Sequence, residues 1–115
     1  MAEGARLLVR VGTRWFEAEP NEVVSFESWQ PLIAIPWPTR FLGLFVCRGA
    51  LVPVVDERRL GCGEVERARI VVCTFADGEV GVAAAEVRFA TADDAFETAP
   101  LSAALDAAFG SRSAA

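Results

Sequence analysis

Short apolar runs rich in β-branched residues alternate along the chain with turn signals made of Gly, Pro, Asn and Asp. This spacing predicts an all-β barrel or sandwich. The first predicted hairpin joins strands at 7–11 and 15–18 around Gly12-Thr13, and a third extended stretch covers 23–29. Pro20-Asn21-Glu22 precedes that stretch and is expected to form one helical turn.

Three prolines fall in the segment 30–40, at Pro31, Pro36 and Pro38. Because proline removes a backbone hydrogen-bond donor, the segment is predicted to be an ordered surface connection and not a regular strand. Its apolar residues are expected to hold it against the core; these are Leu32, Ile33, Ile35 and Trp37.

The clearest hairpin signal covers 43–55, where two apolar runs flank Arg48-Gly49-Ala50. Gly49 can take the positive φ that a short hairpin turn often needs. A charged residue at such a turn is held away from the core, so Arg48 suits recognition of a carboxylate or of the end of a partner helix. A hairpin tip that is merely soluble is the alternative. A helical turn is expected at 56–60.

The second half of the chain continues the β pattern. Residues 70–75 form a buried strand by their β-branched content, and Asp77-Gly78 is the strongest hairpin signal in the chain. Residues 80–82 are predicted to run back, and residues 86–89 alternate as a half-exposed strand should.

The C-terminal part is predicted to be helical over 98–110, with Thr98 as the N-cap and Pro100 in the first turn. Leu101, Leu105 and Phe109 then share one face. Neither an internal repeat nor a coiled-coil heptad pattern is present. The 115 residues are expected to form a single domain, 1–115, with its core over about 6–90.

Composition narrows the possible functions. The net charge is −5, all eleven basic residues are Arg, and no basic block occurs, so a nucleic-acid or anionic-membrane surface is not expected. The three cysteines have no Cys-x-x-Cys spacing and the chain has no His, so neither a metal site nor a cofactor is predicted. Reduced cysteines in apolar runs, no signal-peptide pattern and no membrane-spanning run predict a cytoplasmic location.

Catalytic signals are weak. Without His and Tyr, many acid–base arrangements are unavailable. Asp56-Glu57 and Asp93-Asp94 are adjacent in sequence, and adjacent residues of a strand point to opposite faces, so neither pair is a natural shared-proton dyad. The chain is therefore predicted not to be an enzyme; a pocket with convergent polar groups would revive that alternative.

Residues 41–58, which read FLGLFVCRGALVPVVDER, resemble the signature hairpin of CheW-like domains. The shared features are Gly43, the Arg48-Gly49 turn, Pro53 in a strand, and the Asp56-x-Arg58 ending. Flanking runs fit as well, including Phe16 in the N-terminal hairpin, Val23-Val24, Ile35-Pro36, and the pair of strands at 69–72 and 79–82. The resemblance covers about residues 6–90.

The resemblance implies a mainly β CheW-like fold of two small SH3-like five-stranded barrels around a shared core, with a short C-terminal helix. It also implies an adaptor in two-component chemotaxis signalling, which links the cytoplasmic tip of a methyl-accepting chemoreceptor to the regulatory domain of a histidine kinase. Partner-binding residues by resemblance are Arg48, Gly49, Val46, Gly43 and Val23.

The sequence departs from the family pattern at Val46-Cys47, Ser25 and Ala85, and it lacks the further strands that normally follow. The second barrel is therefore expected to be incomplete, with an open strand edge unless the terminal helix packs over it. Open edges invite pairing with another chain, which leaves a homodimer open. Retained receptor binding with weakened kinase binding is expected. A β-barrel interaction module of another pathway is the alternative.

Overall fold

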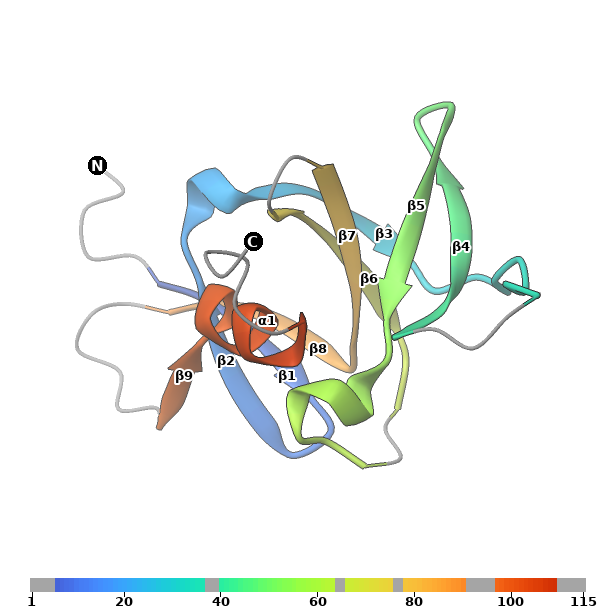
Figure 1. Cartoon of the computed structure of the whole chain (residues 1–115). Coiled ribbons are helices and arrows are strands. Elements are labelled where there is room, and N and C mark those ends of the chain that lie inside the picture. The colour runs from blue at the N-terminus through green and yellow to red at the C-terminus, as the bar shows by residue number, and fades with distance from the viewer. Residues whose placement is uncertain (1–5, 37–39, 64–65, 76–77, 91–96, 110–115) are drawn as a thin grey trace.

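The computed structural model describes residues 6–36, 40–63, 66–75, 78–90 and 97–109 (Figure 1). Two sheets carry most of the described residues, with one α-helix near the C-terminal end and two short 3-10 helices. In chain order the elements are β1 (Arg6–Val11), β2 (Arg14–Ala18), η1 (Pro20–Glu22), β3 (Val23–Ser28), β4 (Phe41–Cys47), β5 (Ala50–Val55), η2 (Glu57–Leu60), β6 (Arg69–Phe75), β7 (Gly78–Ala84), β8 (Glu86–Ala90), β9 (Thr98–Pro100) and α1 (Leu101–Phe109).

The two sheets follow the same plan, although the sequence shows no repeat. One sheet has the strand order β8-β1-β2-β9 and the other β3-β6-β7-β5-β4. In each, three antiparallel strands are followed by a parallel strand, β9 beside β2 or β5 beside β7. That parallel strand leads into a helical segment, α1 or η2. Each half of the chain also lends one strand, β3 or β8, to the sheet of the other half.

The plan is complete in only one of the sheets. In the five-stranded sheet, β4 forms an antiparallel hairpin with β5. Among the described residues, β9 has no corresponding neighbour. Seven residues, 91–97, join β8 to β9, whereas 29–49 join β3 to β5 and contain β4. The predicted incomplete barrel therefore corresponds to the four-stranded sheet, which is built from both ends of the chain.

A shared core fills the space between the two sheets. Strict alternation on β1 and β6 places Leu7, Val9 and Val11 against Val71 and Cys73. The helix α1 adds Leu101 and Leu105 to the same cluster. Burial of so many branched side chains is the main term that holds the sheets together.

The opposite face of the five-stranded sheet has a core of its own. Phe45 and Cys47 of β4 lie with residues of β5 and β6, and the complete buried set is Phe45, Cys47, Val52, Val54, Ile70 and Val72. Pro53 is tolerated within β5, where it pairs with Leu44. The Phe45 ring and its neighbours fill the space that this sheet encloses, so the sheet forms a filled barrel.

The opposite face of the four-stranded sheet is charged instead. Arg6 donates to Glu17 at 2.9 Å, and Arg10 and Arg88 both donate to Glu86, at 3.3 and 2.9 Å. Leu8 lies in the middle of this face and is fully buried. The Arg88 guanidinium also lies over the ring of Trp15.

The C-terminal prediction is corrected in one respect. The helix begins at Leu101, and Thr98–Pro100 is the strand β9, parallel to β2, where a helix start was predicted. Pairing with β2 satisfies this backbone better than an isolated cap would. Leu101 and Leu105 face the core as predicted, and Phe109 packs against Phe41 and Phe75. The helix contacts η2, β2 and β9, so it does not lie along the β8 edge.

The remaining local predictions concern the short helical turns, the hairpin turn and Ile33. The helical turns at 20–22 and 57–60 are confirmed, and the hairpin turn is two residues long, with Ala50 already in β5. Ile33, predicted to be pinned to the core, is half exposed and forms an isolated bridge with Leu44. Predictions on Trp37, Asp77, Asp93-Asp94 and Gly110 lie outside the described residues. No described helix is long and apolar enough to span a membrane.

Candidate functional site

The predicted site lies at the β4–β5 hairpin, which projects at one end of the molecule (Figure 1). Both central residues of its turn have positive φ, 51° at Arg48 and 81° at Gly49. Positive φ at both positions is the mark of a type I′ turn, whose twist matches that of paired strands. Glycine adopts it freely, whereas Arg48 is the only non-glycine residue with positive φ in the described chain.

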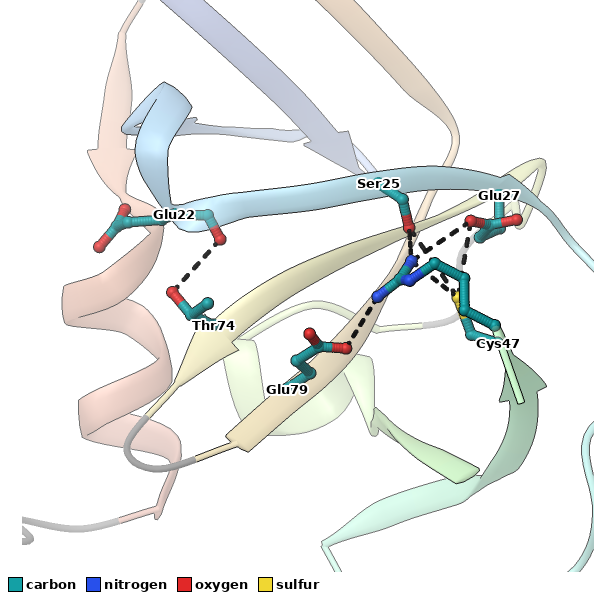
Figure 2. A network of polar contacts seen from close by, with 7 residues as sticks. Glu22, Ser25, Glu27, Cys47, Thr74 and Glu79 are labelled. Atoms are coloured by element: carbon teal, nitrogen blue, oxygen red, sulfur yellow. Dashed lines mark hydrogen bonds and ion pairs between the residues drawn. The ribbon is translucent and has the colours of Figure 1, made fainter. Parts of the chain in front are cut away.

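The Arg48 side chain folds back from the turn across the mouth of the barrel. Its Nη1 donates to the Ser25 hydroxyl at 2.9 Å and lies 3.2 Å from the Cys47 sulfur, and its Nη2 donates to Glu79 at 3.0 Å. The Glu27 carboxylate oxygen Oε2 lies 4.0 Å from the same Nη1. Figure 2 shows these partners converging from β3, β4 and β7.

These contacts join the two edge strands of the five-stranded sheet. Ser25 and Glu27 belong to β3, and Cys47, which lies 3.6 Å from the Glu27 carboxylate, belongs to β4. Side chains therefore close the barrel at this end, in a place where no backbone ladder pairs β3 with β4. We call this set, Ser25, Glu27, Cys47, Arg48 and Glu79, the barrel seam.

The seam changes the interpretation of Arg48. Two carboxylates, Glu27 and Glu79, surround one guanidinium, so an incoming partner carboxylate would be repelled as well as attracted. About half of the Arg48 side chain stays exposed. The geometry gives Arg48 a structural role, and its predicted contact with a partner stays a prediction.

The other predicted site residues are separated by the fold. Val46 and Gly49 are exposed on the hairpin. Gly43 is buried, and a Cβ atom there would lie 2.7 Å from the carbonyl oxygen of Ile33, so this glycine is required for close packing of the backbone. Val23 is partly buried and packs against the shared core.

Val46 instead belongs to an apolar surface on the outer face of the hairpin. It pairs directly with Leu51 across the hairpin, and the two side chains are 55 % and 59 % exposed. Ile33, which bridges to Leu44 on the same strand, lies alongside. We call Ile33, Val46 and Leu51 the hairpin surface.

A second apolar surface, which sequence reasoning missed, lies where the two sheets meet. Phe26 of β3 and Phe89 of β8 are 40 % and 68 % exposed, and their rings meet edge to face with centroids 6.4 Å apart. Both lie on the core-facing sides of their sheets, opposite Val71 and Leu7. We call this pair the junction surface. Alternation over residues 86–89 predicts that Phe89 lies on the same face of its strand as Val87. The contact between the Phe26 ring and the Phe89 ring cannot be predicted from the sequence.

The adjacent carboxylates Asp56 and Glu57 act separately. The Asp56 carboxylate accepts hydrogen bonds from the side chain and backbone N–H of Arg58, and the side-chain bond is the main reason that its pKa is lowered. Glu57 is buried and is held by two bonds from Arg67, at 2.6 and 3.1 Å. Each carboxylate has its own guanidinium, so the pair is not a shared-proton dyad.

The thiols are poor nucleophiles by position. Burial raises the pKa of Cys73 to about 12, and burial also raises that of Cys62. A thiolate is the reactive form of cysteine, so raised values disfavour reaction. Within the described ranges, no three His, Cys, Asp or Glu side chains gather as a metal site would require.

Comparison with known proteins settles the family. The family model of the CheW-like domain matches residues 6–101. This chain belongs to the CheW-like domain family. Among solved structures, the scaffolding protein TtCheW from Thermoanaerobacter tengcongensis is similar with a TM-score of 0.67 and 18 % identity, over 79 % of this chain. No curated protein matches the chain.

The CheW-like fold accounts for the two sheets around a shared core. The chain spans 66 % of the length of TtCheW, so about a third of that protein has no counterpart here. Among the described residues, one sheet has five strands and the other has four.

Proposed function

We propose that this protein is a non-enzymatic, cytoplasmic adaptor of a bacterial chemosensory complex. It binds the helical cytoplasmic tip of a methyl-accepting chemoreceptor and modulates the coupling of that receptor to a histidine kinase. The observation that carries the proposal is the junction surface, where Phe26 and Phe89 expose two aromatic rings on a rigid, two-sheet support in a CheW-like fold.

The chemistry of the junction surface suits protein docking. Aromatic rings bury a large area at a small cost in side-chain entropy, and they are frequent anchors of interfaces. Phe26 and Phe89 come from strands of different sheets, so packing of the shared core fixes their relative position. Such a fixed pair matches the apolar side chains that a partner helix repeats at each turn.

The barrel seam connects the hairpin to β3, the strand that carries Phe26, although Ser25 and Phe26 point to opposite faces of that strand. Arg48 donates to Ser25, the residue that precedes Phe26 on β3. In the proposal, a receptor helix anchored on the two rings also contacts the β4–β5 hairpin at Val46 and Gly49, with Arg48 beside it. Gly43 and Val23 act beneath it, because both support the backbone that carries the contacts.

Kinase binding is proposed to be weak. An adaptor that joins two proteins needs two surfaces, and the four-stranded sheet has no described strand in the place that β4 takes in the other half. The face that would be a barrel interior carries five charged side chains, which are Arg6, Arg10, Glu17, Glu86 and Arg88. A partner adapted to a complete second barrel would lose contacts there.

The test is calorimetric titration of the whole chain with a purified receptor-tip fragment. The double change Phe26→Ser and Phe89→Ser is expected to weaken binding by about tenfold or more, as removal of interface anchors does. Val46→Ser with Leu51→Ser should have a smaller effect, and Arg59→Ser, an exposed change on η2, should have none. Circular dichroism checks that each variant keeps its fold.

Parallel titration with the regulatory domain of the kinase tests the second half of the proposal. Weaker binding to the kinase than to the receptor tip is the expected result. Tight kinase binding would refute the loss of that surface. Absence of receptor binding by the folded wild-type chain would favour the alternative, an interaction module of another pathway.

A further inference from the structure

A hollow of about 320 Å³ lies on the four-stranded half, bounded by the start of β2, the end of η2, β9 and one side of α1. Its floor consists of small apolar side chains, and its complete lining is Arg14, Arg59, Leu60, Ala99, Pro100, Ala103, Ala104 and Ala107. None of these residues belongs to the junction surface or the hairpin surface. The volume is within the usual range of a binding site.

The charge of this hollow is opposite to that of the protein. Its lining includes two guanidinium groups and no carboxylate, in a chain of net charge −5. Arg14 donates to the backbone carbonyl of Leu60 at 2.7 Å and lies over the ring of Phe16, so it is held in place, and no carboxylate among the described residues pairs with it. Arg59 is exposed, and its side chain makes no hydrogen bond or ion pair with any residue that the structure describes.

The two guanidinium groups therefore differ in their roles. Arg14 is positioned by its neighbours, including Gly61, where a Cβ atom would come within 2.7 Å of its Nη1. Arg59 is free to move toward a ligand. Arginine presents several N–H donors in a planar fork that matches a carboxylate, so the pair can bind acidic side chains from one partner segment.

The shape of the hollow selects an elongated partner. Ala103 and Ala107 are one helical turn apart, so the lining extends along the axis of α1. Alanine side chains let a second helix approach closely, since the distance between packed helices depends on the side chains at the contact. A compact ligand would leave much of this open strip uncovered.

We propose that this hollow binds an acidic helix of a partner protein, which packs along α1 and offers carboxylates to Arg59 and Arg14. Charge complementarity carries the choice of partner: two guanidinium groups, with no carboxylate among the lining residues, border an apolar strip on an otherwise acidic molecule. The site goes beyond the receptor contact proposed above, since it uses different elements and different residues. We call it the α1 hollow.

The test uses a defined probe and the full chain. The probe is an acetylated and amidated peptide of about 18 residues, long enough to be helical, made of Ala and Leu with two Glu one turn apart. Titration is followed by ¹H–¹⁵N correlation spectra. The expected result is a saturable set of shifts at Ala103, Ala107 and Arg59, with binding about tenfold or more weaker for the peptide that has Gln in place of Glu.

Charge reversal supplies the matched pair of variants. Arg59→Glu is expected to weaken peptide binding about tenfold or more, whereas Arg69→Glu, which also reverses one exposed arginine, should leave it unchanged. Equal binding of the Glu and Gln peptides, or shifts away from α1, would overturn the proposal. Arg59→Glu should still bind the receptor tip, so failure of the α1 hollow and failure of the receptor contact are distinguishable.

Discussion

The two halves of the molecule share one strand plan but treat the outer face of their sheets in opposite ways. In the five-stranded half, β4 covers that face, and Phe45, Cys47, Val52 and Ile70 fill an apolar interior. In the four-stranded half no described strand covers it, and the corresponding positions carry arginines and glutamates paired with each other. The two sheets therefore differ in the chemistry of their outer faces, which is apolar in one and charged in the other.

This contrast explains how the four-stranded sheet can stay folded with no described strand over its outer face. An uncovered apolar face would expose a large patch and invite aggregation. Paired charges on that face stay partly exposed, with exposed fractions of 18 % at Arg6 and 40 % at Glu17, so they do not form an apolar patch. The core between the sheets is untouched by the change, because it uses the alternate residues of the same strands.

The largest expected effect separates the two outer faces directly. Phe45→Ala should reduce the free energy of unfolding by about 3–5 kcal/mol, because it leaves a cavity in a filled barrel. Trp15→Ala, at the charged face of the other sheet, should cost less than half of that, since its side chain is only partly buried. Urea denaturation measures both; equal losses would contradict the contrast.

The next effect concerns the close contact beneath the hairpin. In Gly43→Ala the new methyl group would lie 2.7 Å from the Ile33 carbonyl oxygen and 2.9 Å from the Leu32 Cβ, so β4 must shift. Such overpacking should cost about 1–3 kcal/mol. Gly63→Ala, where nothing lies within 4 Å of the new atom, is the control and should change stability little.

Sequence alone predicts much of the fold. The β1–β2 and β4–β5 hairpins, the buried strand at 70–75 and the apolar face of α1 follow from alternation and turn residues, which act locally. The strand β9 was missed because three residues with Thr98 and Pro100 also fit a helix start, and only β2, some eighty residues away, decides between them.

The candidate site was less predictable for the same reason. The motif at Arg48 identified the hairpin and the family, but the partners of Arg48 come from β3 and β7. The junction surface depends on Phe26 and Phe89, which are 63 positions apart in the sequence and meet only because the halves exchange strands. Local patterns do not contain that information.

A smaller effect distinguishes the barrel seam from the charged face. Arg48→Met should cost about 1 kcal/mol, because it removes the bonds to Ser25 and Glu79 that join β3 to β4. Arg88→Met should cost less than about 0.5 kcal/mol, as is usual for an exposed pair. Thermal unfolding of both variants gives the comparison, and a larger loss for Arg88→Met would place the seam in doubt.

The smallest effect is on acid stability. Bonds from Arg88 and Arg10 lower the pKa of Glu86, and the bond from Arg58 lowers that of Asp56. A carboxylate with a lowered folded-state pKa stabilises the protein above its unfolded-state value, and this contribution is lost as the pH falls through the folded-state value. Stability should therefore decline in acid, below about pH 4.5.

The variant Glu86→Gln isolates the share of the charged face in this acid sensitivity. It should lower the midpoint temperature slightly at pH 7, and the difference from wild type should be smaller at pH 3, because acid removes the contribution of a carboxylate whose pKa is lowered in the folded state. Differential scanning calorimetry at both pH values makes the comparison. A difference that grows in acid would contradict the assigned pairing with Arg10 and Arg88.

One measurement tests the adaptor account most directly. A ¹H–¹⁵N correlation map of the full chain, recorded with and without a chemoreceptor tip fragment, shows which half meets the receptor. The account predicts shifts at Phe26, Phe89 and the adjoining hairpin, with the charged face at Arg6 and Glu17 unchanged. Shifts confined to the charged face, or a spectrum unaffected by the receptor tip, would contradict it.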